Sequence, residues 1–201
     1  MSIRLPDAQE EITTKRIIVG ISGSSGAVYG ARLLEVLASM DGIETHLVIS
    51  KGAVATLEYE TDYLPDALAA MADVVHDERS LGATIASGTF RTDGMVVAPC
   101  SMKTVSAIAN SYNDNLIVRA ADVCLKERRR LVLVVRETPL HLGHLRLLTA
   151  VTEAGAVVLP PVPGFYTLPK TIGHIVDHTV TKVLDQFDID AGLITRWAGS
   201  R

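Results

Sequence analysis

The chain has 201 residues, a formal net charge of −4, and 48% hydrophobic but only 4% aromatic residues. This length suits one domain, and a negative net charge argues against a nucleic-acid-binding protein. No apolar run approaches the ~20 residues of a membrane-spanning helix, and the charged first residues lack the apolar core of a signal peptide. Two cysteines are too few for a disulfide framework, so we expect a protein of the cytoplasm.

Short apolar runs alternate along the chain with segments of helical periodicity. Strands are predicted at 16–22, 45–50, 95–99, 131–136 and 156–161, with a weaker one near 74–76. Helices are predicted at 26–39, 52–59, 104–110, 116–128, 141–153 and 171–187. This alternation implies an α/β sandwich of three layers with a mostly parallel sheet. We expect residues 1–14 to form a tail and residues 15–190 to form the single domain.

The turn after the first predicted strand reads Gly23-Ser24-Ser25-Gly26. A strand, a turn of small residues and a helix form a seat for an anion, because backbone N–H groups and the positive end of the helix dipole point to one spot. The turn lacks the spaced glycines of a dinucleotide fingerprint, the Gly-Lys-Ser/Thr of a Walker A loop and the second glycine of a nucleophile elbow. Its hydroxyls suggest a phosphate or a flavin edge as ligand, and a plain tight turn is the alternative.

Polar residues also follow three other predicted strands. Ligands of such sheets bind beyond the carboxyl ends of the strands, where the strand order reverses. One such turn is usually only a helix cap or a solvated ion pair. Four of them at one edge favour a mononucleotide with a phosphate at one end and a ring system at the other. The residues that follow the three strands are Ser50 and Lys51, then Ser101, Met102, Lys103 and Thr104, then Arg136, Glu137, Thr138 and Pro139.

Several cations fit a phosphorylated ligand. Arg119 and Lys126 are seven residues apart on one predicted helix and therefore share a face. Arg136 ends a predicted strand and Lys182 lies on the last helix. A phosphate ester carries nearly two negative charges, which several cations can neutralise. The run of arginines at 128–130 is more typical of a solvated helix end than of a phosphate site.

Glu60 and Glu137 are candidate acid–base groups, because each follows an element end near apolar neighbours. Burial would raise their pKa and a nearby cation would lower it, and solvated carboxylates are the alternative. No metal site is expected, since the pair His174 and His178 lacks the glutamate that zinc proteases place after the first histidine. Cys100 is expected to be a buried, inert thiol and not a nucleophile.

The ordered set of motifs closely resembles the UbiX-type flavin prenyltransferases, over about residues 15–197. The stretches that carry the resemblance are Gly23-Ser24-Ser25-Gly26-Ala27, Tyr59-Glu60-Thr61-Asp62, Ser87-Gly88-Thr89-Phe90-Arg91-Thr92-Asp93-Gly94-Met95, Ala98-Pro99-Cys100-Ser101-Met102-Lys103-Thr104, Asn115-Leu116-Ile117, Arg119-Ala120-Ala121-Asp122-Val123, Leu125-Lys126-Glu127-Arg128-Arg129, Arg136-Glu137-Thr138-Pro139-Leu140 and Pro163-Gly164-Phe165-Tyr166.

The resemblance implies a flavodoxin-like or Rossmann-like flavoprotein domain that binds FMN and needs no metal. It implies transfer of a dimethylallyl group from dimethylallyl phosphate, or the diphosphate in some members, to N5 and C6 of reduced FMN. The product, prenylated FMN, would pass to a UbiD-type decarboxylase. The family typically forms dodecamers with sites at subunit contacts, so we expect a homo-dodecamer.

The resemblance also implies roles for individual residues. The positions that match FMN contacts are Gly23, Ser24, Ser25, Ser50, Ser101, Met102, Lys103, Thr104 and Arg136. The positions that match the pocket for the prenyl phosphate are Ser87, Arg119, Lys126, Glu137, Tyr166 and Lys182, with Trp197 of the C-terminal segment 191–201 closing the site or packing on a neighbour. The catalytic set comprises Glu60, Lys126 and Glu137 for acid–base chemistry, with Ser25 beside the flavin N5.

Two positions depart from the family pattern. Many members carry arginine where Lys182 stands, and lysine lacks the planar fork that contacts a phosphate through two bonds. The preference between monophosphate and diphosphate donors is therefore open. In the helix at 141–153, His144 is kept, while Arg146 and Leu147 replace an acidic and an amide residue, and no catalytic role is assigned to that helix.

Two other functions compete with prenyl transfer. An FMN-dependent decarboxylase, or a subunit of one, would act on an aromatic or cysteinyl acid. The cysteinyl group uses a Pro-x-Met-Asn motif and a histidine base that are not visible in this sequence. A non-enzymatic FMN carrier would need the flavin seat but not Glu60, Lys126, Glu137 and Tyr166 together.

Overall fold

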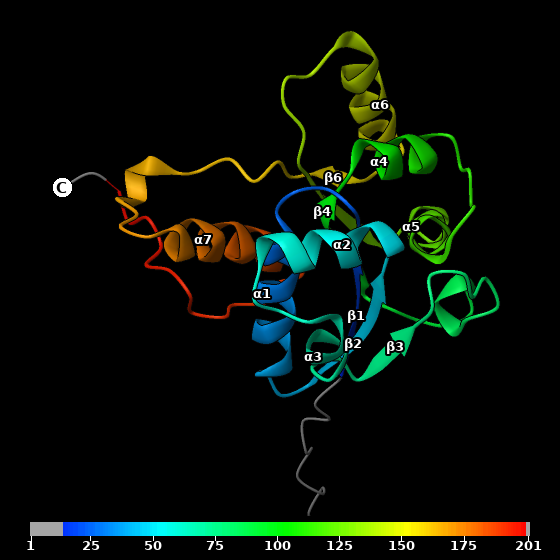
Figure 1. Cartoon of the computed structure of the whole chain (residues 1–201), viewed down its shortest axis with the longest axis horizontal. Helices are drawn as coiled ribbons and strands as arrows, with labels where there is room; N and C mark the ends of the chain where they lie inside the picture. The colour runs from blue at the N-terminus through cyan, green and yellow to red at the C-terminus, as the bar shows by residue number, and fades with distance from the viewer. Residues whose placement is uncertain (1–13, 200–201) are drawn as a thin grey trace, which may run out of the picture.

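The computed structural model describes residues 14–199. The tail predicted at 1–14 lies, apart from Thr14, outside the described residues, as do the last two residues of the C-terminal segment. Six parallel strands form one sheet in the order β3-β2-β1-β4-β5-β6 (Figure 1). This is the strand order of dinucleotide-binding Rossmann domains, and it reverses direction between β1 and β4. The strands are β1 (Lys15–Ile21), β2 (Ile43–Ile49), β3 (Val74–His76), β4 (Gly94–Cys100), β5 (Arg130–Val135) and β6 (Val157–Val158).

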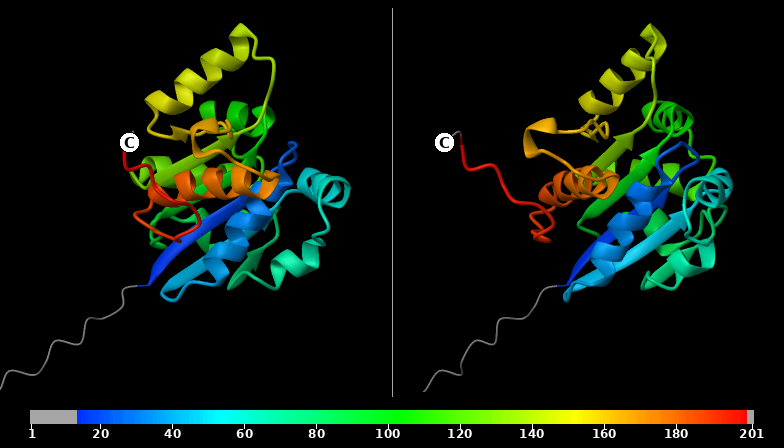
Figure 2. Two further views of the ribbon diagram at one scale, coloured as in Figure 1. Left: turned by 90° about the vertical axis from the view of Figure 1, so that its left-hand side faces the viewer. Right: turned by 60° about the vertical axis from the view of Figure 1, so that its left-hand side comes forward.

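Helices cover both faces of the sheet, which confirms the three-layer α/β sandwich (Figure 2). Helices α1, α2, α3 and α7 pack over one face, while α4, α5 and α6 pack over the other. Alternate residues of β1 enter the two cores, with Val19 in one and Ile18 in the other. The helices are α1 (Ala27–Ala38), α2 (Lys51–Glu60), α3 (Pro65–Ala69), α4 (Met102–Ala109), α5 (Leu116–Lys126), α6 (Leu142–Glu153) and α7 (Ile172–Asp185), with 3-10 turns η1 (Thr84–Ala86) and η2 (Phe165–Thr167).

The predicted strands are all present, and their lengths follow from burial. All seven residues of β4 are buried, as expected for the centre of a parallel sheet. The last strand is shorter than predicted. Leu159 N still donates to Leu133 O, but the prolines at 160 and 161 have no N–H with which to continue the ladder.

The helix predicted at 116–128 ends earlier, at Lys126. Arg128 adopts a left-handed conformation with φ of 56°, which ends the helix and turns the chain into β5. Helix α3 and the two 3-10 turns were not predicted. Each is too short to show a helical period.

A polar cluster links β1 and β2 on the side of the sheet that faces away from α1. Arg16 donates two hydrogen bonds to Glu44, at 2.6 and 2.8 Å, and the buried His46 Nε2 lies 2.7 Å from Glu44 Oε1. The hydrogen bond from Arg16 is the main cause that lowers the pKa of Glu44 to about 2.

Replacing Glu44 by glutamine is expected to lower the free energy of unfolding at neutral pH by about 1–2 kcal/mol. Because the folded pKa lies below the unfolded one, the stabilisation is complete above pH 4.5 and is lost as the pH falls toward about 2. The wild type should therefore lose more stability than Glu44→Gln over that range in urea unfolding. Asp77→Asn, which removes the exposed partner of Arg79, is the control and should change nothing measurable.

Candidate active site

The four polar turns predicted from the sequence meet at one edge of the sheet. This edge lies at the carboxyl ends of β2, β1, β4 and β5, where the strand order reverses. The turns are joined by three backbone hydrogen bonds, from Ser50 N to Ile21 O (3.0 Å), from Ser22 N to Pro99 O (3.2 Å) and from Arg136 N to Cys100 O (3.2 Å). The edge is therefore one continuous platform.

Ser22 joins the two central turns and was not predicted as a site residue. Its hydroxyl donates to Pro99 O at 2.9 Å and accepts from Ser101 N at 2.8 Å, and the residue is 3% exposed. The available signal was a serine at the end of a buried strand, where nucleotide-binding turns usually place glycine. Its partners could not be identified before β4 was known to lie beside β1.

We expect Ser22→Ala to lower the free energy of unfolding by about 1–3 kcal/mol, because it leaves the Ser101 N–H without its partner. FMN affinity should fall as well, since the turns that Ser22 joins move apart. Urea unfolding and flavin fluorescence titration measure the two effects. The control is Ser39→Ala, whose hydroxyl bonds to Val36 O at the far end of α1. An equal loss of FMN affinity in both variants would contradict the prediction.

The first turn lies directly against the start of α2. A Cβ atom added to Gly23 would lie 2.9 Å from the backbone carbon of Gly52, so only glycine fits there. The Ser24 hydroxyl is buried and has no hydrogen-bond partner among the described residues. A buried hydroxyl without a partner fits a ligand oxygen at this position.

Three helices begin at this edge: α1, whose first N–H groups bind Glu60, and α2 and α4, whose first N–H groups have no partner within their own helices. Ser50 caps α2 by accepting from Ala53 N at 3.1 Å, and Ser101 caps α4 by accepting from Thr104 N at 3.3 Å. Helix α1 begins after Gly26, whose φ of 102° allows the tight turn. Converging helix N-termini and the unpartnered Ser24 hydroxyl fit the phosphate of FMN.

Glu60 is bound to the N-terminus of α1. Its Oε2 accepts from Gly26 N at 2.7 Å and from Ala27 N at 3.2 Å, and the nearby Ser25 hydroxyl also lowers the pKa of this carboxylate. Partial burial raises the pKa of Glu60, but these hydrogen bonds and the charge of Arg136 outweigh it and hold the pKa below its ordinary value. Glu60 is therefore an anion at neutral pH, next to the Ser25 hydroxyl.

The other residues of the turn after β4 differ in burial and in which of their groups face the edge. Met102 is 8% exposed and packs into the core, so only its backbone N–H faces the edge. Lys103 is exposed, and Thr104 Oγ1 lies 3.0 Å from Ser101 Oγ. Cys100 is fully buried, as predicted, and this burial raises the pKa of its thiol.

Apart from Glu137, which follows Arg136 at this edge, the predicted phosphate-binding residues fall into two groups elsewhere. Ser87, Arg119 and Lys126 lie around η1 and α5, where Arg119 Nε donates to Ala86 O at 3.1 Å and Lys126 pairs with Glu127. Lys126 precedes β5 and Arg136 follows it, so these two cations lie at opposite ends of that strand. Glu137 is exposed beside Arg136 and accepts from Thr138 N.

The second group lies around α7. Tyr166 and Trp197 pack edge to face with ring centroids 5.8 Å apart, and they line a cavity of about 390 Å³. The Tyr166 hydroxyl lies 3.3 Å from His178 Nε2. Lys182 faces Asp185 at 3.3 Å. None of the described flavin-seat residues lines this cavity.

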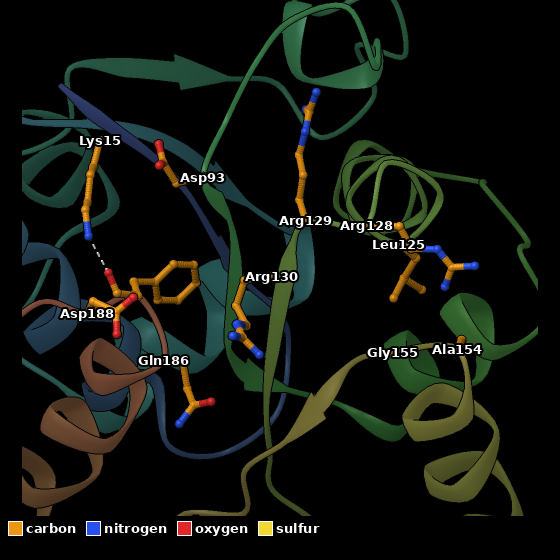
Figure 3. A pocket seen from close by; sticks show the side chains of 11 residues that line it. Lys15, Asp93, Leu125, Arg128, Arg129, Arg130, Ala154, Gly155, Gln186 and Asp188 are labelled. Carbon is orange, nitrogen blue, oxygen red and sulfur yellow. Dashed lines mark hydrogen bonds between the residues drawn. The ribbon is translucent and has the colours of Figure 1, made fainter. Parts of the chain in front are cut away.

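Another cavity, of about 560 Å³, lies at the opposite edge of the sheet (Figure 3). Arg128 and Arg130 line it, while the Arg129 side chain extends away and donates to Gly88 O and Phe90 O. Helices α5, α6 and α7 all end at this cavity, and their last carbonyls carry partial negative charge. The positive charges of these arginines therefore offset the negative ends of the helices, which agrees with the interpretation of residues 128–130 as a solvated helix end.

Residues 14–199 contain no group of three or more histidines, cysteines or acidic residues placed to hold a metal ion. In the same part of the chain, no helix combines the length and apolarity needed to cross a membrane.

Comparison with known proteins places the chain among flavoproteins. The family model "Flavoprotein" matches residues 6–186. The flavin prenyltransferase UbiX of Thauera aromatica is 60% identical, over 92% of this chain and 95% of that protein. The UbiX of Escherichia coli strain K12 is 57% identical, over 92% of this chain and 100% of its own length.

Solved structures agree. The crystal structure of AnUbiX in complex with FMN and dimethylallyl pyrophosphate superposes with a TM-score of 0.91 at 51% identity, covering 93% of this chain and 99% of that one. A dodecameric FMN-dependent UbiX-like decarboxylase from Escherichia coli O157:H7 gives a TM-score of 0.90 at 49% identity, covering 92% and 100% of the two chains. An FMN-dependent cysteine decarboxylase of thioviridamide biosynthesis shares the fold alone, at 18% identity and a TM-score of 0.62. The chain therefore belongs to the UbiX family of flavin prenyltransferases.

Proposed function

We propose that the protein transfers a dimethylallyl group from dimethylallyl phosphate or diphosphate to N5 and C6 of reduced FMN. The prenylated FMN then serves a UbiD-type decarboxylase. The observation that carries this proposal is the Glu60 carboxylate on the N-terminus of α1, next to Ser25 and beside the N-termini of α2 and α4. The relatives named as flavin prenyltransferases and the neighbour with FMN and dimethylallyl pyrophosphate support it.

The residues of the platform hold the flavin. The α2 and α4 N-termini, with the Ser24 hydroxyl, bind the phosphate, and Arg136 and Ser25 face the ring system. Reduced FMN supplies the nucleophilic nitrogen and carbon of the reaction. Ser25 lies next to Glu60, an anion at neutral pH, so these two residues can orient the flavin edge and accept a proton there.

The cations stabilise the leaving group. Breaking the allylic C–O bond releases a phosphate, and fixed positive charges at Arg119, Lys126 and Lys182 lower the energy of that charge in the transition state. Tyr166 and Trp197 provide an aromatic wall for the allyl group. Glu137, next to Arg136, acts as the second acid–base group.

We propose that the complete site forms between subunits of a homo-dodecamer. Lys126 lies at the other end of β5 from Arg136, so the flavin platform of one chain needs the cations of a neighbour. The dodecameric relative supports such an assembly. The C-terminal segment with Trp197, 66% exposed, would close the site or pack on that neighbour. A cytoplasmic location, expected from the sequence, belongs to the same proposal.

Anaerobic incubation tests the function directly. The purified protein is mixed with reduced FMN and either dimethylallyl phosphate or the diphosphate, and the extracted flavin is analysed by mass and spectrum. We expect a flavin that carries one added prenyl group with at least one donor. Unmodified FMN with both donors would contradict the proposal, and release of carbon dioxide from an aromatic or cysteinyl acid would favour the decarboxylase instead.

A further inference from the structure

The loop that follows α2 is attached to α1 at two points. Glu60 binds the first N–H groups of α1, at Gly26 and Ala27. Three residues later, the Tyr63 hydroxyl donates a short hydrogen bond to Glu35, about two turns further along the same helix. Tyr63 is half-buried and packs against the core on this face of the sheet. The chain segment from Glu60 to Tyr63 is therefore fixed to α1 at both of its ends.

Glu35 is in turn tied to α7 through Arg32. Arg32 Nη1 donates to Glu35 Oε2 at 3.2 Å, and Arg32 Nε donates to Asp177 Oδ1 at 2.8 Å. The side chains of Glu35 and Asp177 are only 28% and 23% exposed, so the network is partly shielded from water. Shielded ion pairs that share one cation hold their helices more firmly than isolated surface pairs do.

The network joins two parts of the candidate site. Asp177 precedes His178, whose ring meets the Tyr166 hydroxyl, and both residues line the cavity beside Trp197. The hydrogen bond to Glu35, with burial, raises the pKa of Tyr63 to about 12, so its hydroxyl remains a donor over the whole working range of pH. Arg32, Glu35 and Tyr63 lie outside the motifs that match the family.

We propose that Tyr63, Glu35 and Arg32 are positioning residues that hold the Glu60 carboxylate on the N-terminus of α1, beside Ser25. The effect of this positioning on catalysis rests on the proposed role of Glu60 in prenyl transfer. The hydrogen bonds at Gly26 and Ala27 do not depend on that role, so the proposal can be tested without flavin.

The test variant is Tyr63→Phe, which removes one hydroxyl and keeps the ring. In hydrogen–deuterium exchange of the flavin-free protein, the amides of Gly26 and Ala27 should exchange roughly fivefold faster, because Glu60 leaves them more often. With FMN and donor present, the acid limb of kcat/KM should move to higher pH. The sign follows because losing these hydrogen bonds returns the pKa of Glu60 toward its higher, ordinary value. Glu35→Gln should act in the same direction.

Glu44→Gln is the matched control, because it breaks a partly buried ion pair between β1 and β2. It should lower global stability without changing exchange at Gly26 and Ala27. Unchanged exchange in Tyr63→Phe, or an equal rise in Tyr63→Phe and Glu44→Gln, would overturn the proposal. Faster exchange in a protein that makes no prenylated flavin would support the positioning role and contradict the proposed function.

Discussion

Replacing Lys126 by methionine is expected to slow prenyl transfer by roughly 10²–10³-fold, the usual cost of removing one fixed group that stabilises a transition-state charge. FMN binding should be unchanged, because Lys126 lies before β5 while the flavin platform lies after it. Single-turnover prenylation and flavin titration measure the two effects separately. Methionine keeps the length and the apolar stem of lysine, so the fold should persist.

Mixing variants shows which chain supplies Lys126. Lys126→Met and Glu60→Gln chains, each nearly inactive alone, are unfolded together and reassembled. If one subunit supplies the platform and its neighbour the cation, about a quarter of the sites in a random mixture contain both intact halves. The mixture should then recover activity that neither parent shows.

The control for this experiment is Arg79→Met, which removes another cation from an exposed ion pair with a near neighbour in sequence. It should transfer prenyl groups at the wild-type rate. A mixture no more active than its parents would show that Lys126 acts within its own chain or not at all. Loss of FMN binding in Lys126→Met would show that the residue supports the platform and not the leaving group.

The sequence predicted the platform because its parts are local. A run of consecutive apolar residues predicts a buried strand, and the turn that follows it must lie at the strand's carboxyl end. Once β1, β4 and β5 were predicted to be parallel, their polar turns had to share one edge. The residues at Gly23, Ser101 and Arg136 could therefore be brought together without a structure.

Contacts between distant segments could not be predicted in this way. The Arg32–Asp177 pair spans 145 residues and depends on α1 packing beside α7. The Ser22 hydroxyl donates to a carbonyl of β4 that lies 77 residues away in the sequence. Lys126 could not be assigned for a different reason. Its motif predicts a place in the site, but no sequence pattern tells whether a residue acts in its own subunit or in a neighbouring one.

Gly23→Ala is expected to weaken FMN binding by about 10–100-fold, since overpacking of this kind costs about 1–3 kcal/mol. The new methyl group would lie 2.9 Å from the backbone carbon of Gly52 and 3.2 Å from its oxygen, and neither atom can rotate away. The first turn and the start of α2 must then separate, and the separation opens the seat proposed for the phosphate. Flavin titration and thermal unfolding measure the result.

The reciprocal substitution, Gly52→Ala, makes this prediction specific. A Cβ at Gly52 would lie 3.4 Å from Gly23 Cα, an ordinary van der Waals contact, and alanine inside α2 favours the helix by about 1 kcal/mol. This variant should unfold at a higher temperature than the wild type. Gly82→Ala, with nothing within 4 Å of the added atom, should leave FMN binding unchanged. If Gly23→Ala binds FMN as tightly as Gly82→Ala does, the contact between the first turn and α2 does not shape the flavin seat.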